Sequence, residues 1–357
     1  MTSLLHRLGM SIPLIQAPMA GTSTPALAAA VASAGGLGSI ALGAVDAEAG
    51  RRMIAATRAL TDKPFNVNVF CHAPAIRDAV REAAWLEALA PAFARFGATP
   101  PPAIHEIYTS FLADPAMADM LVAERPAVVS FHFGLPPATV IGRLKAAGAV
   151  LLASATSLAE GRAVEAAGID AVVAQGHEAG GHRGQFDPDA PDDRLSTLAL
   201  AQVLARELGI PVIAAGGIMT GGGIAAALAS GAAAAQLGTA FIGCPESAAD
   251  AGHRAALFSA AAHHTVLTDA ISGRPARCLA NAFTALAATL HTPRAAYPVA
   301  YDAGKALNAA AKAAGNTGFG AQWAGQGAPL ARALPAAELC DLLMREYAAA
   351  RAALVVR

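Results

Sequence analysis

Residues 198–239 read LALAQVLARELGIPVIAAGGIMTGGGIAAALASGAAAAQLGT, and this stretch decides the fold. It holds two copies of one unit, in which an alanine- and leucine-rich helical segment precedes a short run that is apolar throughout. The helical segments are 198–208 and 223–230, and the runs are 212–215 and 234–237. Strands that are buried on both faces have this continuous apolar character. The stretch therefore predicts parallel strands that are connected by helices.

The same unit recurs between residues 14 and 241. Eight apolar runs are candidate strands, at residues 14–17, 38–41, 65–70, 127–131, 150–154, 171–175, 212–215 and 234–237. Candidate helices lie between them, at residues 25–34, 47–60, 137–147, 158–167, 198–208 and 223–230. Eight strands with intervening helices predict an α/β fold of the parallel (β/α)8 or TIM-barrel type. An open, doubly wound sheet has the same local pattern and remains the alternative.

Two segments fall outside this alternation. Residues 73–125 read as helices inserted between the third and fourth strands, and the chain after about residue 259 reads as helical and turn-like. We therefore expect a barrel domain made of residues 1–72 and 126–258. The insertion 73–125 and the region 259–357 are expected to form a second, mainly helical accessory or lid domain.

The composition limits the classes of partner. The 357 residues carry a formal net charge of -1 and only 14% charged residues, so no basic surface is expected for nucleic acid. Residues 8–45 and 208–245 lack Asp, Glu, Lys and Arg, which raises the question of a membrane segment. Glycine and proline break both stretches into runs shorter than the roughly 20 residues of a spanning helix. We expect neither a membrane segment nor a nucleic-acid partner.

The cysteines and the first residues indicate the compartment. Cys71, Cys244, Cys278 and Cys340 lie far apart in the sequence and form no C-x-x-C pair. This spacing disfavours a zinc site or a disulfide framework. Residues 1–10 lack the continuous apolar segment of a secretory signal. The sequence therefore predicts a cytoplasmic protein.

Polar side chains and glycines follow nearly every candidate strand, where a barrel places its active site. Gly216-Gly217 and Gly238-Thr239 follow the seventh and eighth strands, the loops in which barrels often bind phosphate. Glycine lets backbone N–H groups approach a phosphate closely, although such pairs also form tight turns. The neutral amides of Asn68, Gln175 and Gln236 are suited to the polar edge of a flavin ring.

The loop His177-Glu-Ala-Gly-Gly-His182 follows the sixth strand. It superficially matches the metalloprotease pattern H-E-x-x-H, but its histidines are five residues apart and Gly180-Gly181 would break the required helix. We therefore expect no metal. A loop histidine above a barrel can exchange a proton with a ligand, and His132 follows the neighbouring fourth strand. A two-histidine pocket is the interpretation that these positions favour.

Three residues late in the chain recur at a spacing of four. Tyr297, Tyr301 and Lys305 would share one face if this segment is helical. Such a stripe suits a lid that binds an anion, and it equally suits a helix that docks its aromatic face on the protein. The stretch 322–327, QWAGQG, is polar and glycine-rich and reads as a loop.

Together these segments resemble the class I nitronate monooxygenases, formerly called 2-nitropropane dioxygenases. The resemblance covers residues 13–332. It rests on Gln16-Ala17-Pro18-Met19, Ala34-Gly35-Gly36-Leu37-Gly38-Ser39, Phe65-Asn66-Val67-Asn68, residues 175–184, Ala214-Ala215-Gly216-Gly217-Ile218, Gln236-Leu237-Gly238-Thr239, YDAGKAL at 301–307 and QWAGQG at 322–327. The E-A-G-G-H loop and the Q-x-G-T ending are shared with relatives of other activities, whereas the last two motifs are more specific.

The resemblance implies a barrel that holds FMN without a covalent bond. It implies that the enzyme oxidises alkyl nitronates, such as propionate 3-nitronate, with O2 to a carbonyl compound and nitrite or nitrate, which detoxifies nitro compounds. His182 matches the catalytic histidine. His132, Tyr297, Tyr301 and Lys305 match the substrate pocket. The implied flavin contacts are Met19, Asn68, Gln175, Gly180, Gly181, Gly216, Gly217, Gln236, Gly238 and Thr239.

Two other functions remain open from the sequence. A flavin reductase on the same barrel, acting on quinones or on enoyl-acyl-carrier-protein with NAD(P)H, shares the E-A-G-G-H loop. Such reductases are not expected to need the Tyr297, Tyr301 and Lys305 stripe. A non-catalytic flavin- or phosphate-binding protein is the alternative of another class.

Overall fold

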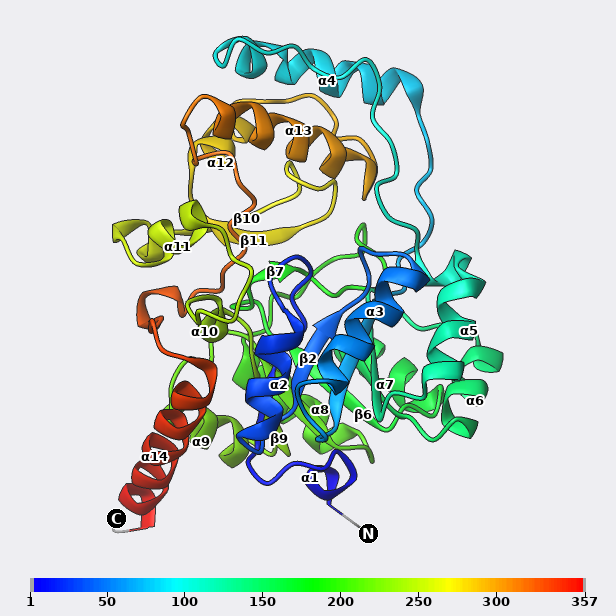
Figure 1. The fold of residues 1–357 in the computed structure, drawn as a ribbon, viewed down its shortest axis with the longest axis vertical. Coiled ribbons are helices and arrows are strands. Elements are labelled where there is room, and N and C mark those ends of the chain that lie inside the picture. Colours follow the sequence, from blue (N-terminus) through cyan, green and yellow to red (C-terminus); the bar gives the residue numbers. More distant parts are fainter. Residues whose placement is uncertain (1–2, 356–357) are drawn as a thin grey trace.

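The computed structural model describes residues 3–355, and its lower part is a parallel β/α barrel (Figure 1). Eight strands are hydrogen-bonded in the order β1-β9-β8-β6-β5-β4-β3-β2. A parallel bridge between Ile15 and Leu37 joins β1 to the start of β2 and closes the sheet. The barrel strands are β1 Leu14–Gln16, β2 Gly38–Ala41, β3 Phe65–Phe70, β4 Val128–His132, β5 Val150–Ala155, β6 Ala171–Gln175, β8 Val212–Ala215 and β9 Ala234–Leu237.

Helices surround the barrel and begin where the sequence supplies capping side chains. Thr24, Asp46, Asp114, Ser157 and Ser196 each accept a hydrogen bond from a backbone N–H of the first helical turn, which satisfies a donor that the helix itself leaves free. The helices on the barrel are α1 Leu4–Arg7, α2 Pro25–Ser33, α3 Ala47–Arg58, α5 Pro115–Glu124, α6 Ala138–Ala146, α7 Leu158–Ala166, α8 Thr197–Glu207, α9 Gly221–Ala229 and α14 Ala336–Val355.

The predicted strands agree with the structure to within one residue at each end, and the predicted helices to within two. The uncharged stretch 8–45 forms β1, α2 and β2, and the stretch 208–245 forms β8, α9, β9 and the short helix α10, Thr239–Ile242. Each stretch is thus divided among several short elements of the barrel wall. Among residues 3–355, no helix combines the length and the hydropathy needed to cross a membrane.

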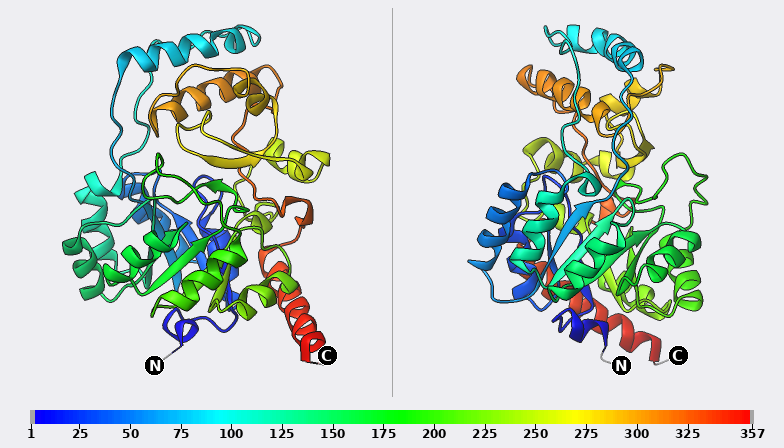
Figure 2. Two further views of the ribbon diagram at one scale, coloured as in Figure 1. Left: turned by 180° about the vertical axis from the view of Figure 1, so that it is seen from behind. Right: turned by 90° about the vertical axis from the view of Figure 1, so that its right-hand side faces the viewer.

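A second group of elements, here called the upper layer, lies above the C-terminal ends of the barrel strands (Figures 1 and 2). Its antiparallel sheet has the order β10-β11-β7, and its helices pack around their own core, which includes Trp85, Phe93, Phe283 and Phe319. The elements are β7 Gly181–His182, β10 Thr265–Thr268, β11 Ala276–Leu279, α4 Ala79–Ala94, α12 Ala282–Ala287 and α13 Val299–Ala313. The helix α11, Ala251–Leu257, lies at its edge.

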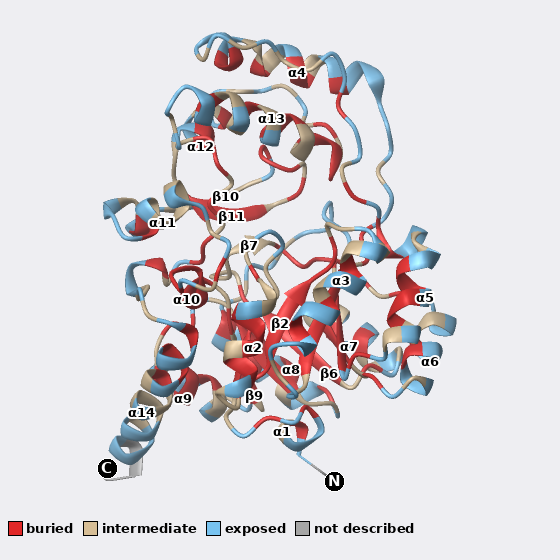
Figure 3. Ribbon diagram, viewed as in Figure 1, coloured by how far each residue is buried: buried red, intermediate tan, exposed pale blue. Residues whose placement is uncertain are grey.

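The segments 73–125 and 259–357, expected to form an accessory or lid domain, each contain one helix that packs on the barrel instead, α5 and α14 (Figure 3). Met120 and Leu121 of α5 and Leu343 of α14 belong to the hydrophobic core of the barrel. A Cβ at Gly221 would collide with the backbone of α14, which shows how closely α14 approaches α9. Both helices carry apolar side chains that the barrel surface buries, so they pack there and not in the upper layer.

The upper layer is also less purely helical than expected. The strands β10 and β11 are four residues each. Because β10 is only partly buried, it does not need the continuous apolar run by which the barrel strands could be predicted. The strand β7 has two residues and comes from the loop after β6. This loop therefore rises from the barrel and joins the sheet of the upper layer, which ties the two parts of the fold together.

Candidate active site

A cavity of about 630 Å³, here called the main cavity, lies over the C-terminal ends of the barrel strands. Its walls come from these strand ends and, on the other side, from residues that include Tyr108 and Trp323. The predicted site residues that line it are Met19, Asn68, His132, Gln175, Gly180, Gly181, His182, Gly216, Gly217, Gln236, Gly238, Thr239, Tyr301 and Lys305. The cavity thus brings together residues, such as Met19 and Lys305, that lie more than 280 positions apart in the sequence.

Tyr297 is the predicted site residue that does not line the main cavity. The helix α13 begins at Val299, after Pro298, so Tyr297 is not on the helical face that carries Tyr301 and Lys305. Its ring packs instead against the ring of His182, with 5.3 Å between the centroids. The predicted three-residue stripe is therefore wrong at its first member, which lies behind the cavity wall.

The floor of the main cavity offers backbone donors at two neighbouring strand ends. Gly217, after β8, has φ 67°, a left-handed conformation that favours glycine. The N–H groups of Gly217 and of Gly238, after β9, donate to no residue in the described part of the chain. Because β8 and β9 are adjacent in the sheet, both donors open onto one side of the floor.

Three side-chain amides lie around this floor, and they differ in how many hydrogen bonds they make within the chain. The Nδ2 of Asn68 donates to the backbone oxygen of Ser130 at 3.1 Å, and its Oδ1 has no partner among residues 3–355. The amide of Gln236 likewise bonds no described residue. By contrast, Gln175 donates from Nε2 to the His182 backbone oxygen at 2.9 Å and accepts from the Gly184 N–H at 2.7 Å. Asn68 and Gln236 are thus open to a ligand, whereas Gln175 fixes the histidine loop.

The upper layer holds His182 through its backbone and through its ring. Its strand β7 pairs with β11, with Ala276 opposite His182, and its Nε2 lies 2.9 Å from the Ser272 hydroxyl. That hydroxyl donates its only hydrogen to the Arg274 backbone oxygen at 3.1 Å. Ser272 must therefore accept a hydrogen bond from His182, so Nε2 of the neutral ring carries the proton. Nδ1 is left as an unprotonated nitrogen with no partner in the described chain.

Burial keeps the His182 ring neutral. The loss of hydration lowers its pKa well below the ordinary value, and the positive charge of Arg274 lowers the pKa further. Arg274 is 3% exposed and makes no ion pair within residues 3–355. Its guanidinium lies 4.3 Å from the centroid of the Phe133 ring and donates to the Gln185 backbone oxygen. The site thus contains a fixed buried cation that disfavours a second charge on His182.

Aromatic rings surround His182 and form the roof of the main cavity. The Trp323 ring centroid is 5.1 Å from that of His182, and the Tyr301 centroid is 6.3 Å away. Lys305, one helical turn after Tyr301, places its Nζ 5.0 Å from the Tyr301 ring centroid and 5.7 Å from that of Tyr108. Burial raises the pKa of the Tyr301 hydroxyl, so it remains a hydrogen-bond donor at neutral pH.

His132 uses both of its ring nitrogens within the chain. Its Nδ1 lies 2.8 Å from the Ser154 hydroxyl, and its Nε2 lies 3.4 Å from the His182 backbone oxygen. Because a carbonyl can only accept, Nε2 donates and Nδ1 accepts. Burial lowers the pKa of His132 to about 4. The geometry makes His132 a positioning residue for His182, and direct contact with a substrate stays a prediction.

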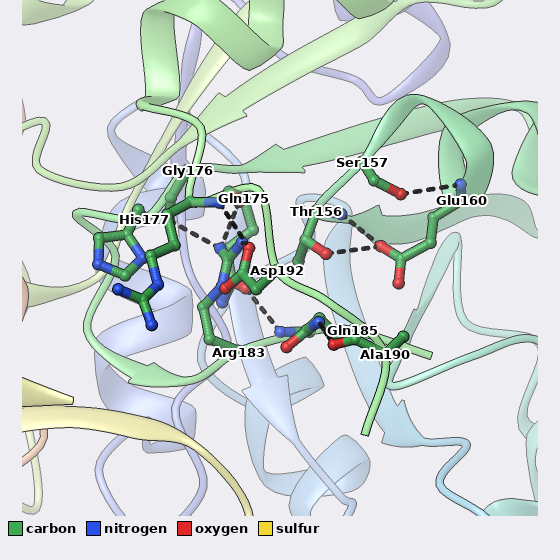
Figure 4. Close-up of polar contacts among 12 residues, drawn as sticks. Thr156, Ser157, Glu160, Gln175, Gly176, His177, Arg183, Gln185, Ala190 and Asp192 are labelled. Atoms are coloured by element: carbon green, nitrogen blue, oxygen red, sulfur yellow. Dashed lines mark hydrogen bonds and ion pairs between the residues drawn. The ribbon is translucent and has the colours of Figure 1, made fainter. Parts of the chain in front are cut away.

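A buried ion pair supports the base of the histidine loop (Figure 4). Arg183 is 2% exposed, and its Nε and Nη2 donate to the two carboxylate oxygens of Asp192 at 2.9 and 2.8 Å. Its Nη1 donates to the backbone oxygens of Gln175 and Gly176 at 2.8 and 3.1 Å. This bidentate pair fixes the end of β6 directly before the loop that carries His182.

The sequence did not single out Tyr108, Ser272 or Arg274. Ser272 and Arg274 lie in the turn Ile271-Ser-Gly-Arg-Pro275, which has no spacing relation to the histidine loop. A signal for Tyr108 exists, since the chain has only 4 tyrosines and this one lies in the inserted segment. Its contact with Tyr301, at 6.4 Å between centroids, depends on how the upper layer folds back over the barrel.

A model of the nitronate monooxygenase family matches residues 2–346. The chain belongs to this family. A nitronate monooxygenase of Paraburkholderia phytofirmans is 65% identical over 345 residues, covering 96% of this chain and 94% of the relative. A nitronate monooxygenase of Pseudomonas aeruginosa is 57% identical over 340 residues, covering 95% of this chain and 97% of the relative.

Two solved structures are similar to this member of the nitronate monooxygenase family at lower sequence identity. The nitroalkane oxidase of Streptomyces ansochromogenes has a TM-score of 0.89 at 43% identity and covers 98% of this chain and 99% of its own. FabK of Thermotoga maritima has a TM-score of 0.74 at 30% identity, with 98% of this chain and 97% of its own covered. The fold is thus shared by both, and the nitroalkane oxidase is the more similar of the two.

Proposed function

We propose that this protein is an FMN-dependent nitronate monooxygenase that oxidises small alkyl nitronates with O2. Family membership supports the reaction class. The observation that carries the proposal is the meeting of His182, Tyr301 and Lys305 in the main cavity, with Nδ1 of His182 free to accept a proton. The proposed products are a carbonyl compound with nitrite or nitrate, which makes the enzyme one that detoxifies nitro compounds.

The floor of the main cavity fits FMN. The main cavity has a volume of about 630 Å³, which lies within the range of cofactor pockets, roughly 300–1,000 Å³. The free N–H groups of Gly217 and Gly238 suit the phosphate, and the open amides of Asn68 and Gln236 suit the ring. The remaining proposed contacts are Met19, Gln175, Gly180, Gly181, Gly216 and Thr239. When bound, FMN would supply the redox chemistry, taking electrons from the nitronate and passing them to O2.

The roof is suited to a small anion. Lys305 supplies a positive charge and Tyr301 a neutral donor, so both would bind the oxygens of a nitronate and fix its orientation. Trp323 and Tyr301 cover His182, which would keep water from the reacting carbon. If the substrate arrives as a neutral nitroalkane, the unprotonated Nδ1 of His182 would remove its α-proton.

The upper layer is proposed to act as an accessory domain that closes the site. Within it, Tyr297 would act through the ring of His182, and His132 would hold the loop from the barrel side. The proposed partners are thus an anionic nitronate and O2, and neither nucleic acid nor a membrane is proposed as a partner. A cytoplasmic location is proposed as well, and it is consistent with the four cysteines, all buried and unpaired in the described chain.

Purified protein tests the proposal directly. We expect it to be yellow, to release FMN on denaturation, and to consume O2 when propionate 3-nitronate is added. A colourless protein that takes up no FMN would refute the cofactor assignment. A yellow protein that reacts with NADH and a quinone but not with nitronate would instead support the flavin reductase.

A further inference from the structure

Thr197, the first residue of α8, lies behind the floor of the main cavity. It is 3% exposed and is not among the residues that line the cavity, so the proposed function gives it no role. Its hydroxyl nevertheless lies 2.9 Å from the backbone oxygen of Gly216, directly before Gly217. Thr197 thus reaches, from behind, the peptide unit whose N–H is a proposed donor to the phosphate.

The Gly216 oxygen and the Gly217 N–H belong to the same peptide unit. Because a peptide unit is planar and trans, its C=O and its N–H point in opposite directions. The C=O points toward Thr197, on the side away from the main cavity, and the N–H therefore points toward the cavity. A hydrogen bond that holds the Gly216 oxygen in place fixes the direction of the Gly217 donor as well.

This peptide unit has little else to fix its orientation. It lies between two glycines, with φ 126° at Gly216 and φ 67° at Gly217, and glycine adopts positive and negative φ about equally well. Within residues 3–355, the hydrogen bond from Thr197 is the only one that the Gly216 oxygen accepts. Loss of this bond would leave the unit free to turn over, and its N–H would then no longer point into the cavity.

The side chain of Glu178 holds Thr197 in this position. One carboxylate oxygen of Glu178 accepts hydrogen bonds from the Thr197 N–H at 2.8 Å and from the Thr197 hydroxyl at 2.9 Å. The hydroxyl has a single hydrogen, which it shares between Glu178 and the Gly216 oxygen. Glu178 belongs to the loop 177–182, so the loop that carries His182 also positions the threonine.

Packing also fixes the Thr197 hydroxyl. A Cβ at Gly216 would lie 2.7 Å from its oxygen, and a Cβ at Gly176 would collide with it outright. The hydroxyl therefore fills the space that two glycines leave at the ends of β6 and β8. This close fit keeps the hydroxyl within hydrogen-bonding distance of the Gly216 oxygen.

We propose that Thr197 is a positioning residue for the cofactor, whose hydroxyl directs the Gly217 N–H toward the phosphate of FMN. The proposal rests on the proposed function and adds to it a residue that touches neither cofactor nor substrate. Its consequence is specific to the phosphate. Loss of the hydroxyl weakens the binding of FMN and leaves the binding of riboflavin, the same flavin without the phosphate, nearly unchanged.

Flavin exchange measures this effect directly. The holoenzyme is equilibrated with a known excess of FMN and riboflavin, free flavin is removed, and the bound flavins are separated and quantified after denaturation. The ratio of bound FMN to bound riboflavin gives the preference for the phosphate. Thr197→Val keeps the size of the side chain but removes the hydroxyl, and it should lower this preference about tenfold, the equivalent of one hydrogen bond to a charged group.

Two control variants separate the hydroxyl from packing and from stability. Thr197→Ser keeps the hydroxyl and should change the preference less than about twofold. Ser196→Ala removes the cap of the same helix, where the Ser196 hydroxyl accepts from the Ala199 N–H at 3.2 Å. This second variant should lower the thermal stability of the protein and leave the preference for FMN unchanged.

A further variant covers the case in which Thr197→Val does not fold. Thr197→Cys then replaces it, because a thiol is only a weak donor, and it should lower the preference about threefold or more. An unchanged preference, or an equal fall in Thr197→Ser, would overturn the role of Thr197 alone. An unaltered protein that takes up neither flavin would instead refute FMN as the cofactor, and with it the proposed function.

Discussion

The floor and the roof of the main cavity are built in different ways. The floor consists of backbone and small side chains at strand ends, such as Gly217 and Gly238, and each group lies within a few residues of its strand. The roof consists of large side chains from separate segments, Tyr108, Tyr301, Lys305 and Trp323. The floor is the part that we propose holds FMN, whereas the roof can differ between enzymes that share this floor. Reaction specificity is therefore expected to depend on the roof.

His182 connects the floor to the roof, so its removal should have the largest effect. His182→Ala removes the base and should lower kcat/KM for neutral nitroalkanes by about 10²- to 10⁴-fold. The effect on a preformed nitronate should be smaller, because no α-proton has to be removed. Steady-state O2 uptake with both substrate forms measures the difference. An equal loss for both forms would show that His182 does not act as the base.

Gly180, in the loop 177–182 that carries His182, packs closely against the loop 322–327 that carries Trp323. A Cβ there would lie 2.5 Å from backbone atoms of Ala324 and Gly325, so Gly180→Ala has to separate the two loops. We expect a loss of about 1–3 kcal/mol in the free energy of unfolding, measured by denaturant titration. Gly142→Ala in α6 is the control, because its Cβ meets nothing within 4 Å and alanine favours a helix. A stable Gly180→Ala variant would contradict the close packing of floor and roof.

Ser272 fixes the tautomer of His182 from the roof side. Ser272→Ala removes the acceptor that holds the proton on Nε2 and should lower kcat with nitroalkanes about tenfold, the free-energy equivalent of one hydrogen bond. Ser154→Ala removes a hydroxyl from the floor, where it bonds His132, and should have a smaller effect. If the Ser154 variant loses more activity than the Ser272 variant, the assigned tautomer of His182 is wrong.

Arg274 should have the smallest effect, a shift in pH dependence. His182 acts as a base only when it is neutral, which requires a pH above its pKa. The charge of Arg274 lowers that pKa, so Arg274→Met should raise it and move the acid limb of kcat/KM to higher pH. Measurement with neutral nitroalkanes from pH 5 to pH 8 tests this. A shift toward lower pH would contradict the sign of the electrostatic effect.

The floor could be predicted from the sequence because its signals are local. The eight strand positions follow from short apolar runs, and the residues after each run are then placed at the same end of the barrel. The shared face of Tyr301 and Lys305 could also be predicted, since a spacing of four on one helix brings side chains to one face. The same spacing placed Tyr297 wrongly on this face, because the helix begins only at Val299.

The rest of the roof could not be predicted in this way. Ser272, Arg274 and Tyr108 reach His182 or its neighbours through tertiary contacts between segments that are distant in sequence. The packing of α5 and α14 on the barrel could not be predicted for a similar reason. Their apolar faces indicate that they are buried, but a single sequence does not indicate against which surface.

Anaerobic mixing of the holoenzyme with substrate tests the central claim most directly, because it isolates the step that the roof is proposed to control. The flavin absorbance is followed after mixing with propionate 3-nitronate and, separately, with NADH. The account predicts rapid bleaching by the nitronate and slow or absent bleaching by NADH. Rapid bleaching by NADH with none by the nitronate would contradict it.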